Sequence, residues 1–268
     1  MSEGLDPRML LRGYAAGIFP MADSRDAGDI FWVEPRNRAI IPLDDFHLSH
    51  SLAKRVRSDR YTVTRDRAFH QVLLACADRP ETWINSIIER ATLGLHAVGH
   101  AHSIECWHDG ELVGGLYGVK LGRAFFGESM FSRMADASKV ALAWLVARLR
   151  IGHFTLLDCQ FMTGHLSSLG ATTVSRDNYA GLLGGALSSA GSSGSAGAGA
   201  AVSGVAVLPA SGEAESGLPA PDFEALDRLL EAEGAAGASG PAGQLIAQLL
   251  GHTSYTGSST TLSEGLSL

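Results

Sequence analysis

The pattern of apolar and polar positions predicts alternating helices and strands up to about residue 175. Helical spacing of apolar residues or helix-start residues predicts helices, whereas short apolar runs bounded by turn residues predict strands. Helices are expected at residues 6–17, 49–58, 67–77, 85–98, 136–150 and 163–169. Strands are expected as two short pieces within 30–41, then at 61–64, 103–108, 111–120, 123–129, 154–159 and 171–175. This order of elements predicts an α+β fold.

Composition separates a body from a tail. We expect a small N-terminal α/β domain at residues 1–61, a second domain at 62–180, and a Gly/Ser/Ala-rich tail at 181–268 that is mostly disordered. Within the tail, residues 221–233 can form one short amphipathic helix, and residues 243–250 are another apolar stretch. Two outcomes stay open for them: they dock on the body, or they stay loose. The formal charge of −7 comes from the tail, where Arg228 alone opposes eight acidic residues. The body is therefore neutral, and binding to nucleic acid requires a local basic patch.

The cysteines and the hydropathy narrow the class of protein. The three cysteines lie far apart in the sequence, with no CxxC pair, so neither a disulfide framework nor a zinc knuckle is expected. No segment approaches the ~20 apolar residues that a membrane helix needs. We therefore expect a cytoplasmic protein with no membrane association. A monomer is the default expectation, because no exposed apolar stripe is evident.

Two carboxylates follow apolar strand segments. Glu128 comes after the aromatic run 123–127, and Asp158 with Gln160 ends the strand expected at 154–159. Glu128 has two interpretations: it caps a turn or pairs with Arg133, or it faces a pocket and binds an amine. If the two strands are neighbours, these polar groups gather at one edge of the sheet, where ligands often bind.

Several motifs carry a family resemblance. They are residues 17–21 (GIFPM), 32–35, 100–105 (HAHSIE), 112–115 (LVGG), 127–133 (GESMFSR), 137–139 (ASK) and 157–160 (LDCQ). They run collinearly over roughly residues 5–180. On these motifs the chain resembles the leucyl/phenylalanyl-tRNA–protein transferase family.

The resemblance implies a fold and a function. The fold is an acetyltransferase-like (GNAT-like) domain at residues 62–180, after the small N-terminal domain. The function is transfer of Leu or Phe, or Met, from Leu-tRNA or Phe-tRNA to proteins with N-terminal Lys or Arg, which marks them for degradation by the N-end rule pathway. Residues 133–138 lack the glycines of a coenzyme A loop, so no coenzyme A and no other cofactor is expected.

The chemistry of this reaction is aminolysis of an activated ester, in which positioning and charge stabilisation matter most. We assign Asp158 to orient Gln160, and Gln160 to bind the acceptor α-amine or the developing oxyanion. Glu128 would hold the aminoacyl α-amino group or assist proton movement. His100, His102 and His165 are metal ligands by type, yet no carboxylate or Cys stands at ligand spacing, and no metal is expected.

The resemblance also implies the substrate contacts. Trp32 and Trp83 match positions that grip the terminal adenine of tRNA, although loop tryptophans are more often packing residues. The side-chain pocket for Leu or Phe corresponds to three apolar residues that would otherwise be ordinary core: Leu116, Phe125 and Leu145. The family has Met at the first of these positions and Phe at the third, so the Leu-versus-Phe preference stays open.

Six basic residues cluster between residues 54 and 67. They are Lys54, Arg55, Arg57, Arg60, Arg65 and Arg67. From spacing alone the cluster is as easily a solvated basic face as a binding site. The resemblance favours contacts to the tRNA backbone, which would be salt-sensitive and independent of sequence.

Two other hypotheses stay open at this point. One is an acyltransferase of the same fold that uses another activated donor. The other is a non-catalytic RNA-binding module, in which the basic cluster and the tryptophans matter and the carboxylates are structural. Transfer of a labelled amino acid from tRNA to a peptide would separate the three.

Overall fold

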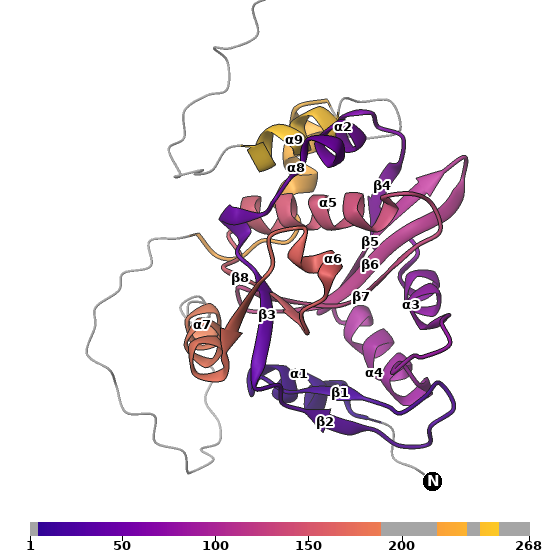
Figure 1. Ribbon diagram of the computed structural model, residues 1–268, viewed down its shortest axis with the longest axis vertical. Coiled ribbons are helices and arrows are strands. Elements are labelled where there is room, and N and C mark those ends of the chain that lie inside the picture. The colour runs from indigo at the N-terminus through magenta and orange to yellow at the C-terminus, as the bar shows by residue number, and fades with distance from the viewer. Residues whose placement is uncertain (1–4, 189–218, 235–241, 252–268) are drawn as a thin grey trace, which may run out of the picture.

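A seven-stranded sheet forms the centre of the protein (Figure 1). The computed structural model describes residues 5–188, 219–234 and 242–251. The strand order is β4-β5-β6-β7-β8-β3-β9, and all neighbours are antiparallel except the parallel pair β7 and β8. The strands of this sheet are β3 (Asn37–Ile41), β4 (Thr62–Arg65), β5 (Ala101–His108), β6 (Glu111–Leu121), β7 (Ala124–Ser132), β8 (Leu156–Gln160) and β9 (Thr172–Ser175). A separate two-stranded sheet pairs β1 (Phe19–Met21) with β2 (Phe31–Val33).

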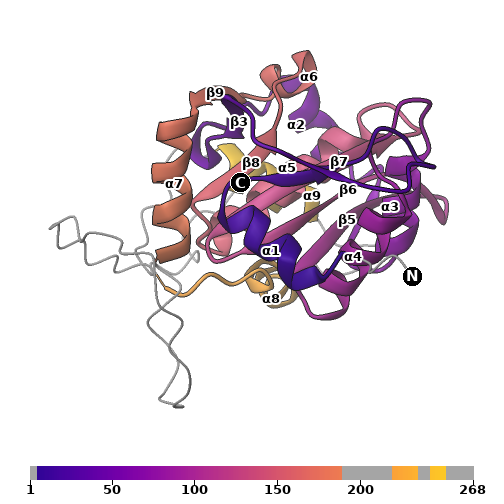
Figure 2. The same ribbon diagram turned by 90° about the horizontal axis from the view of Figure 1, so that it is seen from below.

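Helices cover both faces of the large sheet. The helices are α1 (Pro7–Ala15), α2 (His50–Arg57), α3 (Phe69–Ala77), α4 (Ser86–Ala97), α5 (Ala137–Ile151), α6 (Gly164–Ser167), α7 (Arg176–Ser188), α8 (Ala225–Ala232) and α9 (Ala242–Gly251), with a 3₁₀ turn at Leu43–Asp45. One face packs against α5, which lies under α2, α8 and α9, and the other against α1, α3 and α4 (Figures 1 and 2). The core is therefore two apolar layers, one on each side of the sheet.

The local sequence accounts for the meander β5–β6–β7. Asp109 and Gly110 both have positive φ, as a two-residue hairpin turn requires, and His108 pairs directly with Glu111. Gly114 on β6 allows α5 to approach closely, because a Cβ there would lie 2.4 Å from the Cβ of Ala137. The apolar helix α5 then crosses over the sheet and returns the chain as β8, parallel to β7, as such a pairing requires.

The predicted α+β class is confirmed, and the predicted helices and strands of residues 5–175 are present within a few residues. The structure adds contacts across both expected domain boundaries. Strand β3, from within residues 1–61, pairs with β8 and β9 in the main sheet. Helix α7 runs across residue 180 and buries Tyr179, Leu183 and Ala186 against the body.

Two segments of the expected tail are folded onto the body. Phe223, Leu226 of α8 and Ile246 of α9 are buried in the core around α5, so residues 219–234 and 242–251 are ordered rather than loose. The rest of the expected disorder concerns residues 189–218, 235–241 and 252–268, which lie outside the described residues. Among the helices that the structure describes, none has the length and hydropathy to span a bilayer.

Candidate active site

Strands β7 and β8 part from one another beside the candidate site. Their parallel pairing ends at Phe126 and Asp158. Beyond this point β7 continues beside β6, whereas β8 continues beside β3. The two strands therefore open a gap in the sheet, and Glu128 and Gln160 each lie two residues past the last pair. The expectation that two neighbouring strands gather these polar groups is thus met.

A β-bulge in β7 orients the side chain of Glu128. Gly118 pairs with Gly127 and Tyr117 pairs with Ser129, so Glu128 is an extra residue of β7 without a partner on β6. Bulges of this kind redirect a side chain and are common beside active sites. Glu128 is therefore within the strand rather than at its end, where we had placed it, and the bulge turns its carboxylate toward β8.

Gln160 meets Glu128 across the gap. Its Nε2 donates a hydrogen bond to Oε1 of Glu128 at 2.9 Å. The backbone of Gln160 is in the left-handed region, with φ of 62°, which costs a residue with a Cβ about 1 kcal/mol or more. The backbone N–H of Gln160 donates to Oδ1 of Asp158 at 2.8 Å, and this bond helps to hold the unusual conformation.

Asp158 is fully buried, and its carboxylate accepts hydrogen bonds from Arg38, Tyr179 and the backbone N–H of Gln160. Arg38 on β3 donates to it through Nε and Nη2, at 2.9 and 2.7 Å, and the hydroxyl of Tyr179 on α7 donates at 2.7 Å. The guanidinium of Arg38 lies between the rings of Phe19 and Tyr179, 4.6 and 4.7 Å from their centroids. Asp158 is therefore a buried support that fixes the position of Gln160 rather than a group open to a ligand.

The pKa of Glu128 is shifted toward neutrality. Burial, the largest effect, raises its pKa to about 7, while hydrogen bonds from Tyr14 and Gln160 act in the opposite direction. The Tyr14 hydroxyl donates to Oε1 of Glu128 at 2.8 Å, and burial raises the pKa of Tyr14 so that it keeps this proton. A carboxyl group with a pKa near neutrality can both accept and release a proton at physiological pH.

A cavity of about 220 Å³ opens beside these groups. Glu128 and Gln160 line it, together with Cys159. Three of the predicted substrate-contact residues line it too: Trp83, Leu116 and Leu145. Apolar lining residues that the sequence had not pointed to include Met130, Leu142 and Leu157. The cavity thus combines an apolar interior with polar groups where β7 and β8 separate, as small-molecule binding sites commonly do.

The comparisons with known proteins agree with the motifs. Residues 40–184 match the family model for leucyl/phenylalanyl-tRNA protein transferase, and residues 3–36 match the model for its N-terminal domain. This chain belongs to the leucyl/phenylalanyl-tRNA protein transferase family. A transferase of this name from Rhizorhabdus wittichii is 59% identical over 257 residues, covering 94% of this chain and 100% of the relative. One from Novosphingobium aromaticivorans is 53% identical over 266 residues, covering 94% and 98%.

A solved structure is also similar, more distantly. The structure of L-PGS from Bacillus licheniformis matches 62% of this chain and 56% of that chain, with 14% sequence identity and a TM-score of 0.35. At such a score the likeness does not assign this transferase family member to the acetyltransferase-like class, which stays a prediction.

Two of the residues implied by the family resemblance lie away from the cavity lining. Phe125 is fully buried, and its ring stacks on that of Phe223, with centroids 5.5 Å apart. Phe223 belongs to residues 219–234, which we call the C-terminal segment. Trp32, on β2, packs against α1 so closely that a Cβ on Gly13 would lie 2.3 Å from its ring. In this member of the transferase family Phe125 therefore serves packing, and we do not carry it forward as a pocket residue. Trp32 is only partly buried, and its contact with the terminal adenine stays a prediction.

The six predicted tRNA-backbone residues divide into two groups. Lys54, Arg57, Arg60 and Arg67 are exposed. Arg55 lies 3.7 Å from a carboxylate oxygen of Asp136, and Arg65 is bound by the acidic residues around it. Four of the six thus remain candidates for phosphate contacts in this transferase family member.

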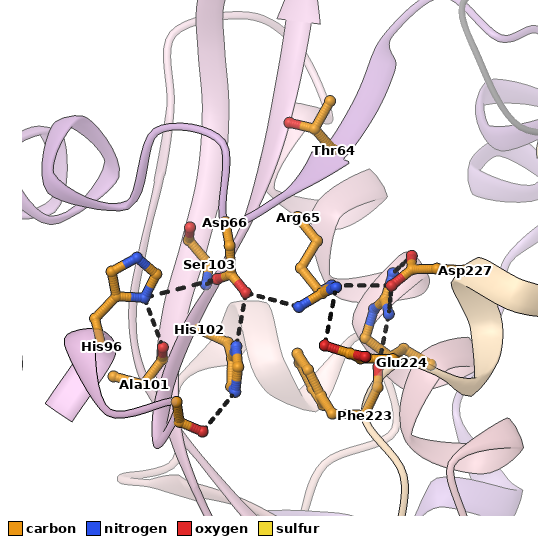
Figure 3. A network of polar contacts seen from close by, with 12 residues as sticks. Thr64, Arg65, Asp66, His96, Ala101, His102, Ser103, Phe223, Glu224 and Asp227 are labelled. Carbon is orange, nitrogen blue, oxygen red and sulfur yellow. Dashed lines mark hydrogen bonds and ion pairs between the residues drawn. The ribbon is translucent and has the colours of Figure 1, made fainter.

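Arg65 belongs to a network that attaches the C-terminal segment (Figure 3). Its guanidinium bridges Asp66 at 3.0 Å and Asp227 of α8 at 2.9 Å. His102 is buried, and its Nδ1 forms a hydrogen bond with Oδ2 of Asp66 at 2.7 Å. The centroid of its ring lies 4.3 Å from that of Phe223. Among the described residues, no group of three or more His, Cys, Asp or Glu side chains is arranged to hold a metal ion.

Proposed function

We propose that this protein transfers leucine or phenylalanine from aminoacyl-tRNA to the α-amino group of a protein. The observation that carries the proposal is the meeting of Glu128 and Gln160 at an apolar cavity, in a chain that belongs to the leucyl/phenylalanyl-tRNA protein transferase family. The acceptors would begin with Lys or Arg, and the modified proteins would enter the N-end rule degradation pathway. The protein would act in the cytoplasm as a monomer, with an acetyltransferase-like domain at its centre.

The cavity would take the aminoacyl side chain, with Leu116 and Leu145 against it and Trp83 against the terminal adenine. The acceptor amine attacks the ester carbonyl, a C–N bond forms, and the bond to the ribose 3′-oxygen breaks. Gln160 would orient the amine, and its position depends on the support that Asp158 receives from Arg38. Such positioning is the main source of acceleration for an ester that is already activated.

Glu128 would move the proton. Its pKa of about 7 suits a group that takes a proton from the attacking amine and passes it to the leaving 3′-oxygen. Tyr14 donates to the same carboxylate and would steady it while its charge changes. Because the ionised form is the acceptor, the transfer rate should rise with pH through about 7 in wild type. The acceptor amine loses its own proton near pH ~8 in both proteins, so in Glu128→Gln only this later rise should remain.

The test is transfer of labelled Leu from tRNA to a peptide with N-terminal Arg, with a peptide beginning with Glu as the control. Label on the Arg peptide alone supports the proposal. Transfer to a different amine would favour another acyltransferase, and bound tRNA without transfer would favour an RNA-binding module. Within the same assay Gln160→Ala should lower turnover about 100-fold or more, whereas Trp83→Ala should mainly raise the KM for the tRNA.

A further inference from the structure

Arg79 lines the mouth of the cavity and has no part in the proposed chemistry. It lies in the loop between α3 and α4, four residues before Trp83, and both side chains border the cavity with Glu128. Its Nη2 donates a hydrogen bond to the Ser129 hydroxyl at 2.6 Å. This bond directs the guanidinium along the rim next to Glu128, while the side chain remains exposed to solvent.

The charge of Arg79 is not neutralised by a neighbouring acid. Among the ion pairs of residues 5–188, 219–234 and 242–251, none includes Arg79. The adjacent Asp78 and Glu81 are exposed and form no ion pair in the same ranges. A guanidinium with one neutral hydrogen-bond partner keeps several donors available for an anion.

The acylated end of tRNA carries one suitable anion close to the reacting ester. The terminal nucleoside holds the ester on its 3′-oxygen and a phosphodiester on its 5′-oxygen, so the two groups are separated by one ribose. We propose that Arg79 binds this phosphodiester while the adenine lies against Trp83. The inference rests on the proposed function and adds to it the residue that reads the backbone nearest the reaction.

The alternative partner, the acceptor protein, fits the charge poorly. An acceptor that begins with Lys or Arg brings positive charge from its side chain and its α-amine, and Arg79 would repel both. The rim beside Arg79 is therefore the donor side of the cavity. A phosphate also suits the planar guanidinium, which can donate two parallel hydrogen bonds to it.

Binding of two stable donor analogues tests the inference. Both carry phenylalanine in amide linkage to 3′-amino-3′-deoxyadenosine; one has a free 5′-hydroxyl and the other a 5′-methyl phosphodiester. We expect wild type to bind the phosphodiester form about 10- to 100-fold more tightly, the range for a charge-assisted contact. Arg79→Ala should remove this preference and leave the affinity for the 5′-hydroxyl form unchanged, while Arg79→Lys should retain part of it.

Arg90→Ala is the matched control. Arg90 is an exposed arginine on α4 that does not line the cavity, and its loss should leave the preference intact. Salt gives a second measurement: in Arg79→Ala the slope of log affinity for aminoacyl-tRNA against log salt should become shallower by about 0.7, the value for one phosphate contact on a single strand.

Three results would overturn the inference: no preference for the phosphodiester in wild type, a preference that survives in Arg79→Ala, or an equal loss of both analogues in that variant. The binding measurement does not depend on turnover. Wild type that binds with the expected preference but transfers no amino acid would contradict the proposed function alone.

Discussion

The chemistry of the site between β7 and β8 depends on the protonation of Glu128 and the backbone conformation of Gln160. Glu128 lies in a bulge, and burial raises its pKa. Its carboxylate accepts hydrogen bonds from Tyr14 and Gln160. Gln160 accepts an unfavourable φ so that its amide can reach Glu128. Both features lower stability and are therefore expected at a site selected for function rather than for folding.

The raised pKa of Glu128 makes stability depend on pH. The folded-state pKa is about 7 against an ordinary value of 4.5, so the penalty for ionising Glu128 in the folded protein grows as pH rises through this window. Between about pH 5 and 8 we expect wild type to lose about 2 kcal/mol of unfolding free energy relative to Glu128→Gln. Urea denaturation of both proteins at each pH measures the difference, in which groups common to both cancel. A constant difference would contradict the raised pKa.

The left-handed backbone of Gln160 gives a second prediction at this scale. Gln160→Ala and Gln160→Gly remove the same amide, but only glycine adopts φ of 62° without strain. We expect the glycine variant to be about 1 kcal/mol more stable than the alanine variant, and both to show the same large loss of transfer activity. Equal denaturation midpoints for the two variants would show that the backbone relaxes once the amide is gone.

Among the elements, α2 and β4 show how a basic cluster can serve two purposes. Arg57 at the end of α2 is exposed, whereas Arg65 at the end of β4 bridges acidic residues of the body and of α8. Sequence spacing gives the two arginines the same appearance. Their partners in the folded protein assign one to solvent and the other to the attachment of the C-terminal segment.

Substitution should separate the two arginines. Arg57→Ala should weaken binding of aminoacyl-tRNA and leave unfolding unchanged, because no buried group loses a partner. Arg65→Ala should lower the unfolding free energy by about 1 to 2 kcal/mol, since Asp227 loses a charge-assisted bond that is partly exposed. Filter binding and urea denaturation on both variants test this, and a reversed pattern would mean that Arg65 is the phosphate contact.

At the scale of the whole molecule, one sheet joins segments that lie far apart in the sequence. The polar groups of the candidate site depend on β3, β7, β8, α1 and α7. Its apolar lining includes residues of α5, the helix against which α8 and α9 pack. Phe223 is the anchor of the C-terminal segment: it is 2% exposed and lies against Phe125, Phe154 and His102.

Phe223→Ala should therefore destabilise the entire body, by about 3 to 5 kcal/mol as for other buried phenylalanines. Thermal unfolding measures the effect, with Glu231→Ala, an exposed position on α8, as the control that should change little. Transfer activity below the lowered melting temperature should persist, because Phe223 does not line the cavity. A melting temperature equal to that of wild type would mean that the C-terminal segment is not part of the cooperative unit.

Much of this could be predicted from local sequence. The helices, the meander and its Asp109-Gly110 turn follow from periodicity and turn residues, and Glu128, Asp158 and Gln160 follow from polar residues after apolar strands. The bulge at Glu128 depends on register between two strands, which local patterns do not determine. Arg38 had a signal, as a lone charge in an apolar strand. Tyr14 and Tyr179 had none, because their roles arise only when distant elements meet.

The clamp on Asp158 has a consequence for how the protein is made. Arg38 is synthesised early, Asp158 120 positions later and Tyr179 later still, yet all three must be present to hold Gln160. When only the chain up to β7 has left the ribosome, Arg38 lacks its partner Asp158, and Glu128 lacks the hydrogen bond from Gln160. We therefore expect the nascent polypeptide to stay catalytically silent until α7 has emerged.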